Sequence, residues 1–302
     1  MKNKNNGIWI AVIISSVCVI IGIHAMDLEN TGHRRSFLYK VAHPWKVARE
    51  EEERKEALKL DLVFSINARD VVGVQRFIDL GADVNWIYPV FNTSMLGRAI
   101  EVGSPAIVDA LIRSGANVEQ AYGDGMLTPL LRAVGLHNVP IITLLLRAGA
   151  DVNHVNGRGD SPLLIACERG DLDSVEILLE HGAHKDYVKH SSETPLSVAV
   201  QAQNVPIVQA LIAAGADVNR ADSLYRAVSA NNIVLVEILL RAGADVNAML
   251  VGWSSRSILS SVYGSLAYLE ATSEIDMDLQ KNLKITLLRE IIRMLTERGA
   301  RR

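Results

Sequence analysis

A short motif recurs at a nearly constant interval along this chain of 302 residues, and that interval limits the folds open to it. The motif reads Gly-Ala-Asp-Val-Asn from positions 81, 149, 215 and 243, and shorter versions begin at Gly115 and Gly182. The first five of these glycines in chain order are separated by 34, 34, 33 and 33 residues. Self-similarity at this period is typical of supersecondary units that stack and share one core. The sequence therefore predicts a solenoid.

A second landmark predicts a helix near the start of each unit. Thr128-Pro129-Leu130 is repeated as Ser161-Pro162-Leu163 and as Thr194-Pro195-Leu196. The hydroxyl group can accept a hydrogen bond from a first-turn amide, and proline suits the first helical position, where its missing N–H costs nothing. The second helix of a unit ends in strings such as Leu-Leu-Leu-Arg-Ala-Gly, closed by Gly149, because glycine readily takes a left-handed conformation. Each unit should contain a turn, a helix, a short connection and a second helix.

With these landmarks the chain resembles the ankyrin repeat family. Residues 151–183 carry the pattern most completely, with Ser161-Pro162-Leu163, Ala166, Gly170-Asp171-Leu172 and Gly182-Ala183. The resemblance covers about residues 60–302 and implies an all-α solenoid of about seven helix-turn-helix units with short β-turn fingers. The expected units lie near residues 60–92, 93–126, 127–159, 160–192, 193–221, 222–254 and 255–302.

Several units depart from the family pattern. The histidine that often follows Thr-Pro-Leu is replaced by Leu131, Leu164 and Ser197, so apolar packing is expected there. The residues His137, Gln203 and Asn231 stand where other units have glycine, which predicts a strained left-handed turn. The interval from position 215 to 243 is only 28 residues, which predicts a missing finger, and an insertion around residues 263–284 predicts longer helices in the last unit.

The N-terminal residues 1–25 are predicted to meet a membrane. Lys2 and Lys4 precede an uncharged run at residues 7–25, close to the ~20 residues that span a bilayer. Because these cations precede the run and Asp27 and Glu29 follow it, the N-terminus is expected in the cytoplasm and the repeats on the opposite side. The alternative is cleavage near Ala25, which gives a secreted or periplasmic protein. Residues 26–57 form a polar linker and a charged helix that starts at Pro44, and residues 58–302 form the repeat domain.

Composition and motifs argue against several classes of function. A net charge of −3 and a pI near 6.3 disfavour nucleic-acid binding. Without a phosphate loop, nucleophile elbow or zinc-protease helix, no catalytic residue, cofactor, metal or small-molecule substrate is expected. Cys167 is interpreted as a packed residue, and His181, His184 and His190 as turn residues rather than metal ligands. An enzyme would require an unrecognised site, for example near residues 263–284.

A binding role for another protein is the function that the resemblance implies, through the turn tips and the concave face of the inner helices. The first finger carries Trp86, Tyr88 and Phe91 in a chain with 5% aromatic residues, and exposed aromatics are enriched in binding hot spots. The alternative is that the helix around Trp45 covers them. The remaining candidate contact residues lie on later fingers: Tyr122, Asp124, His154, Asn156, Arg158, Tyr187 and Lys189. The chain is predicted to be a membrane-tethered scaffold or adaptor, and the alternative is an inhibitor or immunity-type protein that masks an enzyme.

Overall fold

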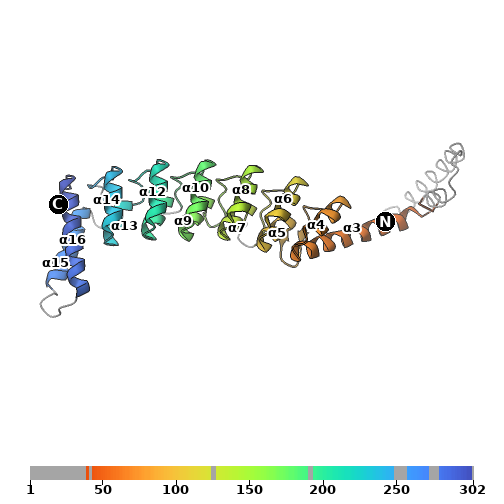
Figure 1. Ribbon diagram of the computed structural model, residues 1–302, viewed down its shortest axis with the longest axis horizontal. Helices are drawn as coiled ribbons and strands as arrows, with labels where there is room; N and C mark the ends of the chain where they lie inside the picture. The colour runs from red at the N-terminus through yellow and green to blue at the C-terminus, as the bar shows by residue number, and fades with distance from the viewer. Residues whose placement is uncertain are drawn as a thin grey trace, which may run out of the picture. The chain divides into compact units, whose positions relative to one another are not determined.

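The computed structural model describes residues 39–40, 43–123, 127–189, 193–247, 257–271 and 279–300. In these residues the chain forms fourteen helices and one two-stranded hairpin, which confirms a helical repeat fold (Figure 1). The chain divides into two compact units, of which the first consists of Met1–Phe64 with Gln75–Asp83. The second unit consists of Ser65–Val74 with Val84–Arg302 and holds most of the repeats.

The N-terminal part of the described chain contains helices α3 (Pro44–Asn67) and α4 (Val71–Asp79). Helix α3 begins at Pro44, as the sequence predicts, but it is one continuous helix of 24 residues. The charged helix and the first helix of the first repeat are therefore a single element, and the boundary drawn between residues 57 and 58 lies inside it. Pairs such as Arg49–Glu53, with Nε and Oε1 3.1 Å apart, lie on its exposed face.

Successive helix pairs build the second unit (Figure 1). The pairs are α5 (Met95–Val102) with α6 (Pro105–Arg113), α7 (Pro129–Gly135) with α8 (Val139–Arg147), α9 (Pro162–Arg169) with α10 (Leu172–Glu180), α11 (Pro195–Gln201) with α12 (Val205–Ala213), α13 (Ser223–Ser229) with α14 (Ile233–Arg241), and α15 (Ile258–Ala271) with α16 (Leu279–Glu297). The first helix of each pair, here called the inner helix, packs on the inner helices of neighbouring pairs. The second helices pack on one another in the same order, so every pair completes the core of the next.

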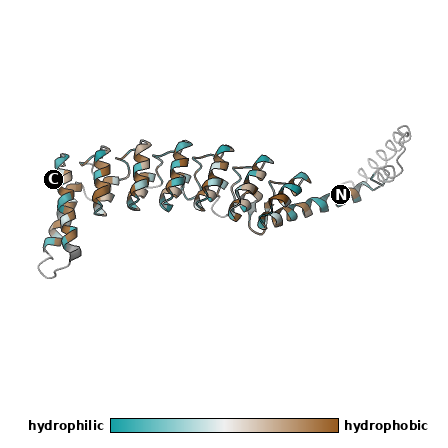
Figure 2. Ribbon diagram, viewed as in Figure 1, coloured by the Kyte–Doolittle hydropathy of each residue, from teal (hydrophilic) through white to brown (hydrophobic). Residues whose placement is uncertain are grey.

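The threonine, serine and proline landmarks begin the inner helices as expected. The side chains of Thr128, Ser161 and Thr194 each accept a hydrogen bond from the amide three residues later. The next leucines in these landmarks are buried in the core, where they contribute to the hydrophobic stabilisation of the stack. Figure 2 shows hydrophobic residues concentrated along the helices of each pair.

The three residues that replace the family histidine lie in the core. Leu131 and Leu164 are fully buried, which confirms apolar packing at these positions. Ser197 is also buried but stays polar by forming a reciprocal capping box with Thr194: each side-chain oxygen accepts the backbone N–H of the other residue. The Ser197 hydroxyl is therefore satisfied at a buried position where two other units have leucine.

The predicted left-handed turns are present. His137, Gln203 and Asn231 have φ angles of 56°, 55° and 53°, in the region that favours glycine. Where the finger was predicted to be missing, the chain passes from Asn219 to α13. Asp222 is the N-cap residue of this helix; its backbone is in the left-handed region, and its side chain makes no capping hydrogen bond. In the last pair, α15 has 14 residues and α16 has 19, compared with 7 to 9 in the helices from α5 to α14, which confirms the expected lengthening.

The fingers precede the inner helices. In the first finger, β1 (Ile87–Tyr88) pairs antiparallel with β2 (Thr93–Ser94), and later fingers have single bridges between Tyr122 and Leu127 and between Lys189 and Glu193. These short ladders confirm the predicted β-turn fingers.

Among the described helices, none combines the length and the apolar character that crossing a membrane requires. The predicted membrane segment at residues 7–25 lies outside the described residues, so its membrane role stays a prediction.

Candidate protein-binding surface

A ladder of hydrogen bonds joins the base of each finger to the next. In the units that this ladder joins, the side chain of the fifth residue of the Gly-Ala-Asp-Val-Asn motif, or of the residue at that position, accepts a backbone hydrogen bond. The donor is the N–H of the third residue of the next copy of the motif. The bonds are Asn117 N to Asn85 Oδ1 at 2.7 Å, Asp151 N to Glu119 Oε1 at 2.7 Å, His184 N to Asn153 Oδ1 at 2.7 Å, Asp217 N to Asp186 Oδ1 at 2.8 Å, and Asp245 N to Asn219 Oδ1 at 2.7 Å. The repeated asparagines thus connect the base of one finger to the next unit.

The first finger carries an aromatic cluster of Trp86, Tyr88 and Phe91. The ring centroids of Trp86 and Tyr88 are 5.7 Å apart, and those of Tyr88 and Phe91 are 5.5 Å apart. Trp86 and Tyr88 are half-buried, whereas Phe91 is 58% exposed. Because neighbouring Ile87 and Val90 are also exposed, the finger presents a largely apolar tip to solvent.

An arginine pair, Arg98 and Arg132, adjoins the aromatic cluster. The guanidinium carbon of Arg98 lies 5.5 Å from the centroid of the Phe91 ring, in cation–π geometry. Arg98 Nε donates to Asn67 Oδ1 at 2.6 Å, and Glu101 accepts from both arginines at 3.2 Å. This pair is not among the contact residues predicted from the sequence, although each arginine lies four residues after the N-cap of its inner helix, a correspondence between units that is visible in the sequence.

Tyr122 is a correction to the predicted surface, because its side chain is only 8% exposed. Its ring packs against Gly97 on α5: a Cβ atom there would lie 2.6 Å from two ring carbons. Burial raises the pKa of the Tyr122 phenol, and the nearby Glu101 carboxylate raises it further, so the group stays neutral. Gly97 stands where other units have Leu131 and Leu164, and this exchange of leucine for glycine was the signal that a ring from the next finger fills the space.

Asn156 is a second correction, since it is 7% exposed and acts inside its own finger. Its Oδ1 accepts the backbone N–H groups of Arg158 at 2.8 Å and Asp160 at 2.9 Å, and its Nδ2 donates to Asp160 Oδ2 at 3.2 Å. The side chain thereby satisfies polar groups that the tight turn leaves without backbone partners. Asp124, another predicted contact residue, lies outside the described residues.

The remaining predicted contact residues divide between exposed positions and links between fingers. Arg158 is exposed and His154 is half-buried. Tyr187 Oη donates to the carbonyl of Gly159 at 3.1 Å, and Lys189 Nζ lies 2.6 Å from Asp160 Oδ1. These two residues therefore join successive fingers, and a role of any of the four in binding stays a prediction.

Asp160 is the centre of a small charged cluster. Burial raises the pKa of its carboxyl group, but hydrogen bonds from Lys189 and Asn156 oppose this effect, and the net result is a lowered pKa. The pKa of Lys189 is raised by the same pairing with Asp160. The pKa of Glu168, whose Oε1 is 3.9 Å from Lys189 Nζ, is raised by burial. The cluster therefore ties two fingers to α9 through one shared lysine.

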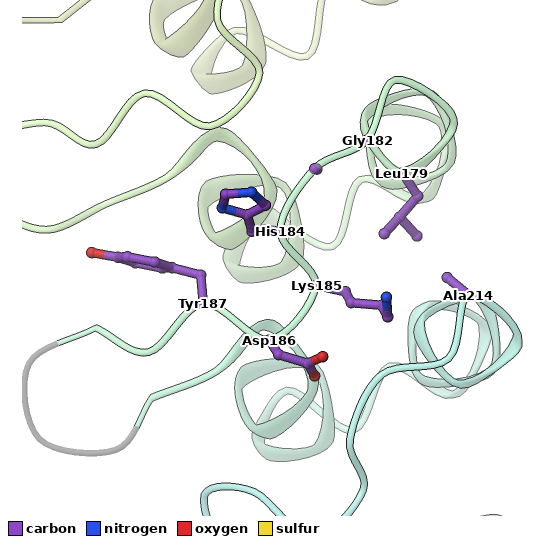
Figure 3. A pocket seen from close by; sticks show the side chains of 8 residues that line it. Leu179, Gly182, His184, Lys185, Asp186, Tyr187 and Ala214 are labelled. Atoms are coloured by element: carbon purple, nitrogen blue, oxygen red, sulfur yellow. The ribbon is translucent and has the colours of Figure 1, made fainter.

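Two shallow hollows lie elsewhere on the second unit. The first, of about 500 Å³, is bordered by residues 182–187 with Leu179 and Ala214. In Figure 3 the side chains of Leu179 and Lys185 point towards Ala214, while the ring of Tyr187 points away from it. The second, of about 550 Å³, lies between α13 and the last helix pair and includes Tyr268 and Lys284. Neither includes a residue of the aromatic cluster.

Comparisons with known proteins agree with this architecture. The sequence model described as ankyrin repeats (3 copies) matches residues 130–222 and 188–250. The human ASB11 ankyrin repeat domain is similar at 23% identity and a TM-score of 0.58, over 80% of this chain and 98% of that one. The ankyrin repeat domain of Bcl-3, described as a unique member of the IkappaB protein family, is similar at 23% identity and a TM-score of 0.63, over 76% of this chain and 97% of that one. No curated protein matches the sequence significantly. Residues 130–250 of this chain therefore match the ankyrin repeat model, and the fold of the described residues is that of an ankyrin-repeat solenoid.

Proposed function

We propose that this chain is a non-enzymatic module that binds another protein through the aromatic cluster of its first finger and the adjoining inner-helix face. Ankyrin repeat domains are protein interaction modules, and that role fits a stack whose turns vary while its core is shared. The observation that carries the proposal is the aromatic cluster at the tip of the first finger, in which Phe91 is exposed and contacts the half-buried ring of Tyr88. Such rings supply contact area at a low cost in conformational entropy.

The rigid mounting of the finger supports the same role. Asn85, at the base of the finger, accepts the amide of Asn117 and donates to the carbonyl of Gly115, so it connects this finger to the next unit. A surface held in this way loses little conformational freedom on binding, and a larger share of the contact energy appears as affinity.

We also propose that residues 7–25 tether the module to a membrane, with the repeats on the extracytoplasmic side. The support is the length of the uncharged run and the position of Lys2 and Lys4 before it. Membrane fractionation of the full chain, with mass spectrometry of its N-terminus and protease protection of the repeats, tests this. An intact start at Met1 in the membrane fraction is expected; a soluble chain that starts near residue 26 would contradict the tether.

The binding proposal is tested by quantitative affinity purification of the full chain and two variants from cells. The surface variant carries Tyr88→Ser and Phe91→Ser. The control carries Val234→Ser and Leu283→Ser, which change side chains that are 54% and 60% exposed on other helices. At least one protein that co-purifies with the wild type and the control should be lost from the surface variant, at equal helical circular dichroism. Identical sets of proteins for all three chains would refute the assignment of this surface.

A further inference from the structure

The inner-helix face beside the aromatic cluster has more cations than anions. Arg98 Nη1 is 3.2 Å from Glu101 Oε2, and Arg132 Nη2 is 3.2 Å from Glu101 Oε1, so two guanidinium groups share one carboxylate. Arg69 adds a third cation at the C-terminal end of α5, the end away from the finger, where it donates a hydrogen bond of 2.6 Å to the carbonyl of Val102. The local charge is therefore positive, although the whole chain has a net charge of −3.

A second carboxylate, that of Asp70, is next to Arg69 in the chain. Asp70 Oδ1 accepts the backbone N–H of Gly73 at 3.0 Å and so caps the start of α4, a hydrogen bond that does not remove the charge of a carboxylate. Among these described side chains, the three arginines still outnumber the two carboxylates.

The arginine pair also retains capacity to donate hydrogen bonds. A guanidinium group has five N–H donors and suits bidentate pairing with carboxylates. Within the described residues, the buried Nε of Arg132 has no hydrogen-bond acceptor, and neither has the buried hydroxyl of Tyr122. The Arg132 side chain is 38% exposed and the Arg98 side chain is 27% exposed, so both are reachable from solvent. A carboxylate arriving from solvent would pair with the exposed terminal N–H groups of these two arginines rather than with the buried Nε of Arg132.

The positive face and the aromatic cluster form one continuous surface. Arg98 lies over the ring of Phe91, and Phe91 contacts Tyr88, so a charged site is next to an apolar one. The bond from Arg98 Nε to Asn67 Oδ1 holds the guanidinium group in this position. A peptide with a carboxylate beside an aromatic or aliphatic side chain would meet both sites at once.

The described cluster that links the third and fourth fingers has no such excess of cations. Lys189 Nζ lies 2.6 Å from Asp160 Oδ1 and 3.9 Å from Glu168 Oε1. Arg158 and Glu193 also act on these carboxyl groups, so cations do not outnumber anions there. The arginine pair is therefore the better candidate for an anionic partner.

We propose that the arginine pair and the aromatic cluster together bind an acidic peptide segment of the partner, with an Asp or Glu side chain on Arg98 and Arg132 and an adjacent apolar side chain on Phe91. This inference rests on the proposed function and names the chemistry of the partner. It predicts recognition by charge and by apolar contact, each contributed by a different set of residues, so the two can be tested separately.

The test is a selection of random 12-residue peptides displayed on phage against the immobilised full chain in detergent, followed by synthesis of the consensus peptide. Selected peptides should be enriched in Asp or Glu beside an aromatic or aliphatic residue. Replacing those acidic residues with Asn or Gln should weaken binding by about tenfold, since charge-assisted hydrogen bonds are the strong ones. Raising the salt concentration should weaken binding of the acidic peptide more than binding of its amide version.

Variants of the chain identify the surface. Arg98→Gln and Arg132→Gln should each reduce the preference for the acidic peptide over its amide version by about tenfold. Arg98→Lys keeps the charge and should give an intermediate loss, because lysine lacks the bidentate fork. The control is Arg113→Gln on the outer helix α6, which removes an exposed arginine paired with Asp109 and should leave the preference unchanged. Thermal melting of each variant checks its fold. Comparing the acidic and amide peptides on the wild-type chain tests the inference without any substitution in the chain.

The outcomes separate this inference from the proposed function. One outcome is a set of peptides that depend on Phe91, as shown by loss of binding to Phe91→Ser, but that are not enriched in Asp or Glu, or are enriched in Lys and Arg. That result would overturn the inference of an acidic partner and support binding by the aromatic cluster. A selection without any peptide that depends on Phe91, Arg98 or Arg132 would overturn both.

Discussion

At the scale of single residues, the asparagine after each Gly-Ala-Asp-Val string has a role that extends beyond its own turn. Asn153 accepts the amide of His184 at 2.7 Å and donates to the carbonyl of Gly182 at 3.2 Å, so one amide side chain satisfies two groups of the next unit. Glu119 and Asp186 take the same position elsewhere and keep the acceptor role. A carboxylate has no N–H to donate, which explains why asparagine is the more complete solution.

Replacing Asn153 with alanine should lower the free energy of unfolding by about 1–2 kcal/mol, because the amide of His184 loses its acceptor. Asn153→Asp keeps an acceptor oxygen and should cost less than the alanine variant. Urea denaturation followed by circular dichroism measures both changes. An alanine variant as stable as the wild type would show that the ladder does not stabilise the stack.

At the scale of elements, the pairing of Lys189 with Asp160 connects one finger to the next and makes this connection dependent on pH. The folded-state pKa of Asp160 is lowered, whereas an unfolded aspartate titrates at about 3.9. The contribution of Asp160 is therefore present above that pH and is lost as the pH falls through the lower folded value. Glu168, with a raised pKa, contributes in the opposite sense, because its protonation relieves the cost of burying its charge.

The variant Lys189→Met should have a lower melting temperature than the wild type at pH 7, because Asp160 loses the cation that lies 2.6 Å away. The difference should shrink as the pH falls below about 4, where aspartate becomes protonated in the unfolded chain, and it should be lost as the pH passes the lowered folded-state pKa of Asp160. Thermal melts across this range provide the measurement. A difference that stays constant with pH would mean that Lys189 acts through packing alone.

The buried thiol of Cys167 reports on the opening of the central helix pair. Cys167 is fully buried in α9, and burial raises the pKa of its thiol, so alkylation at pH 8 requires local unfolding. In a Cys18→Ser chain, Cys167 should react with iodoacetamide far more slowly than in urea. Leu163→Ala, which removes a core side chain from α9, should accelerate the reaction at least tenfold, whereas Val234→Ala should not. Alkylation of the native chain at the unfolded rate would contradict this packing.

The elements also show how far the sequence determines the fold. Landmarks that act within one unit, such as the Thr194 cap and the left-handed Gln203, were predictable because their partners lie a few residues away. Contacts between units were harder to predict. The ring of Tyr122 fills the space above Gly97, and Lys189 reaches Asp160, because stacking brings residues about 30 positions apart together.

At the scale of the whole molecule, the candidate surface follows from two kinds of sequence variation on a repeated backbone. The fingers vary in the residues that stacking leaves exposed, which places Phe91 at a tip. The inner helices repeat Arg98 and Arg132 at corresponding positions, which places two cations side by side. The aromatic residues were predictable from composition and from their place in a finger. The corresponding positions of Arg98 and Arg132 are visible in the sequence, whereas their shared pairing with Glu101 is visible only in the structure. The partner itself is proposed from this chemistry and not from the fold, which supports many unrelated functions.

Contact between the first finger and a partner protein can be measured by site-specific photo-crosslinking in cells. A photoreactive phenylalanine analogue replaces Phe91 in the full chain, and in a control chain it replaces Val234, which is 54% exposed on α14. We expect a crosslink from position 91 to a specific protein, reduced by Arg98→Gln and absent from position 234. The same adducts at both positions, or none at position 91, would contradict that contact.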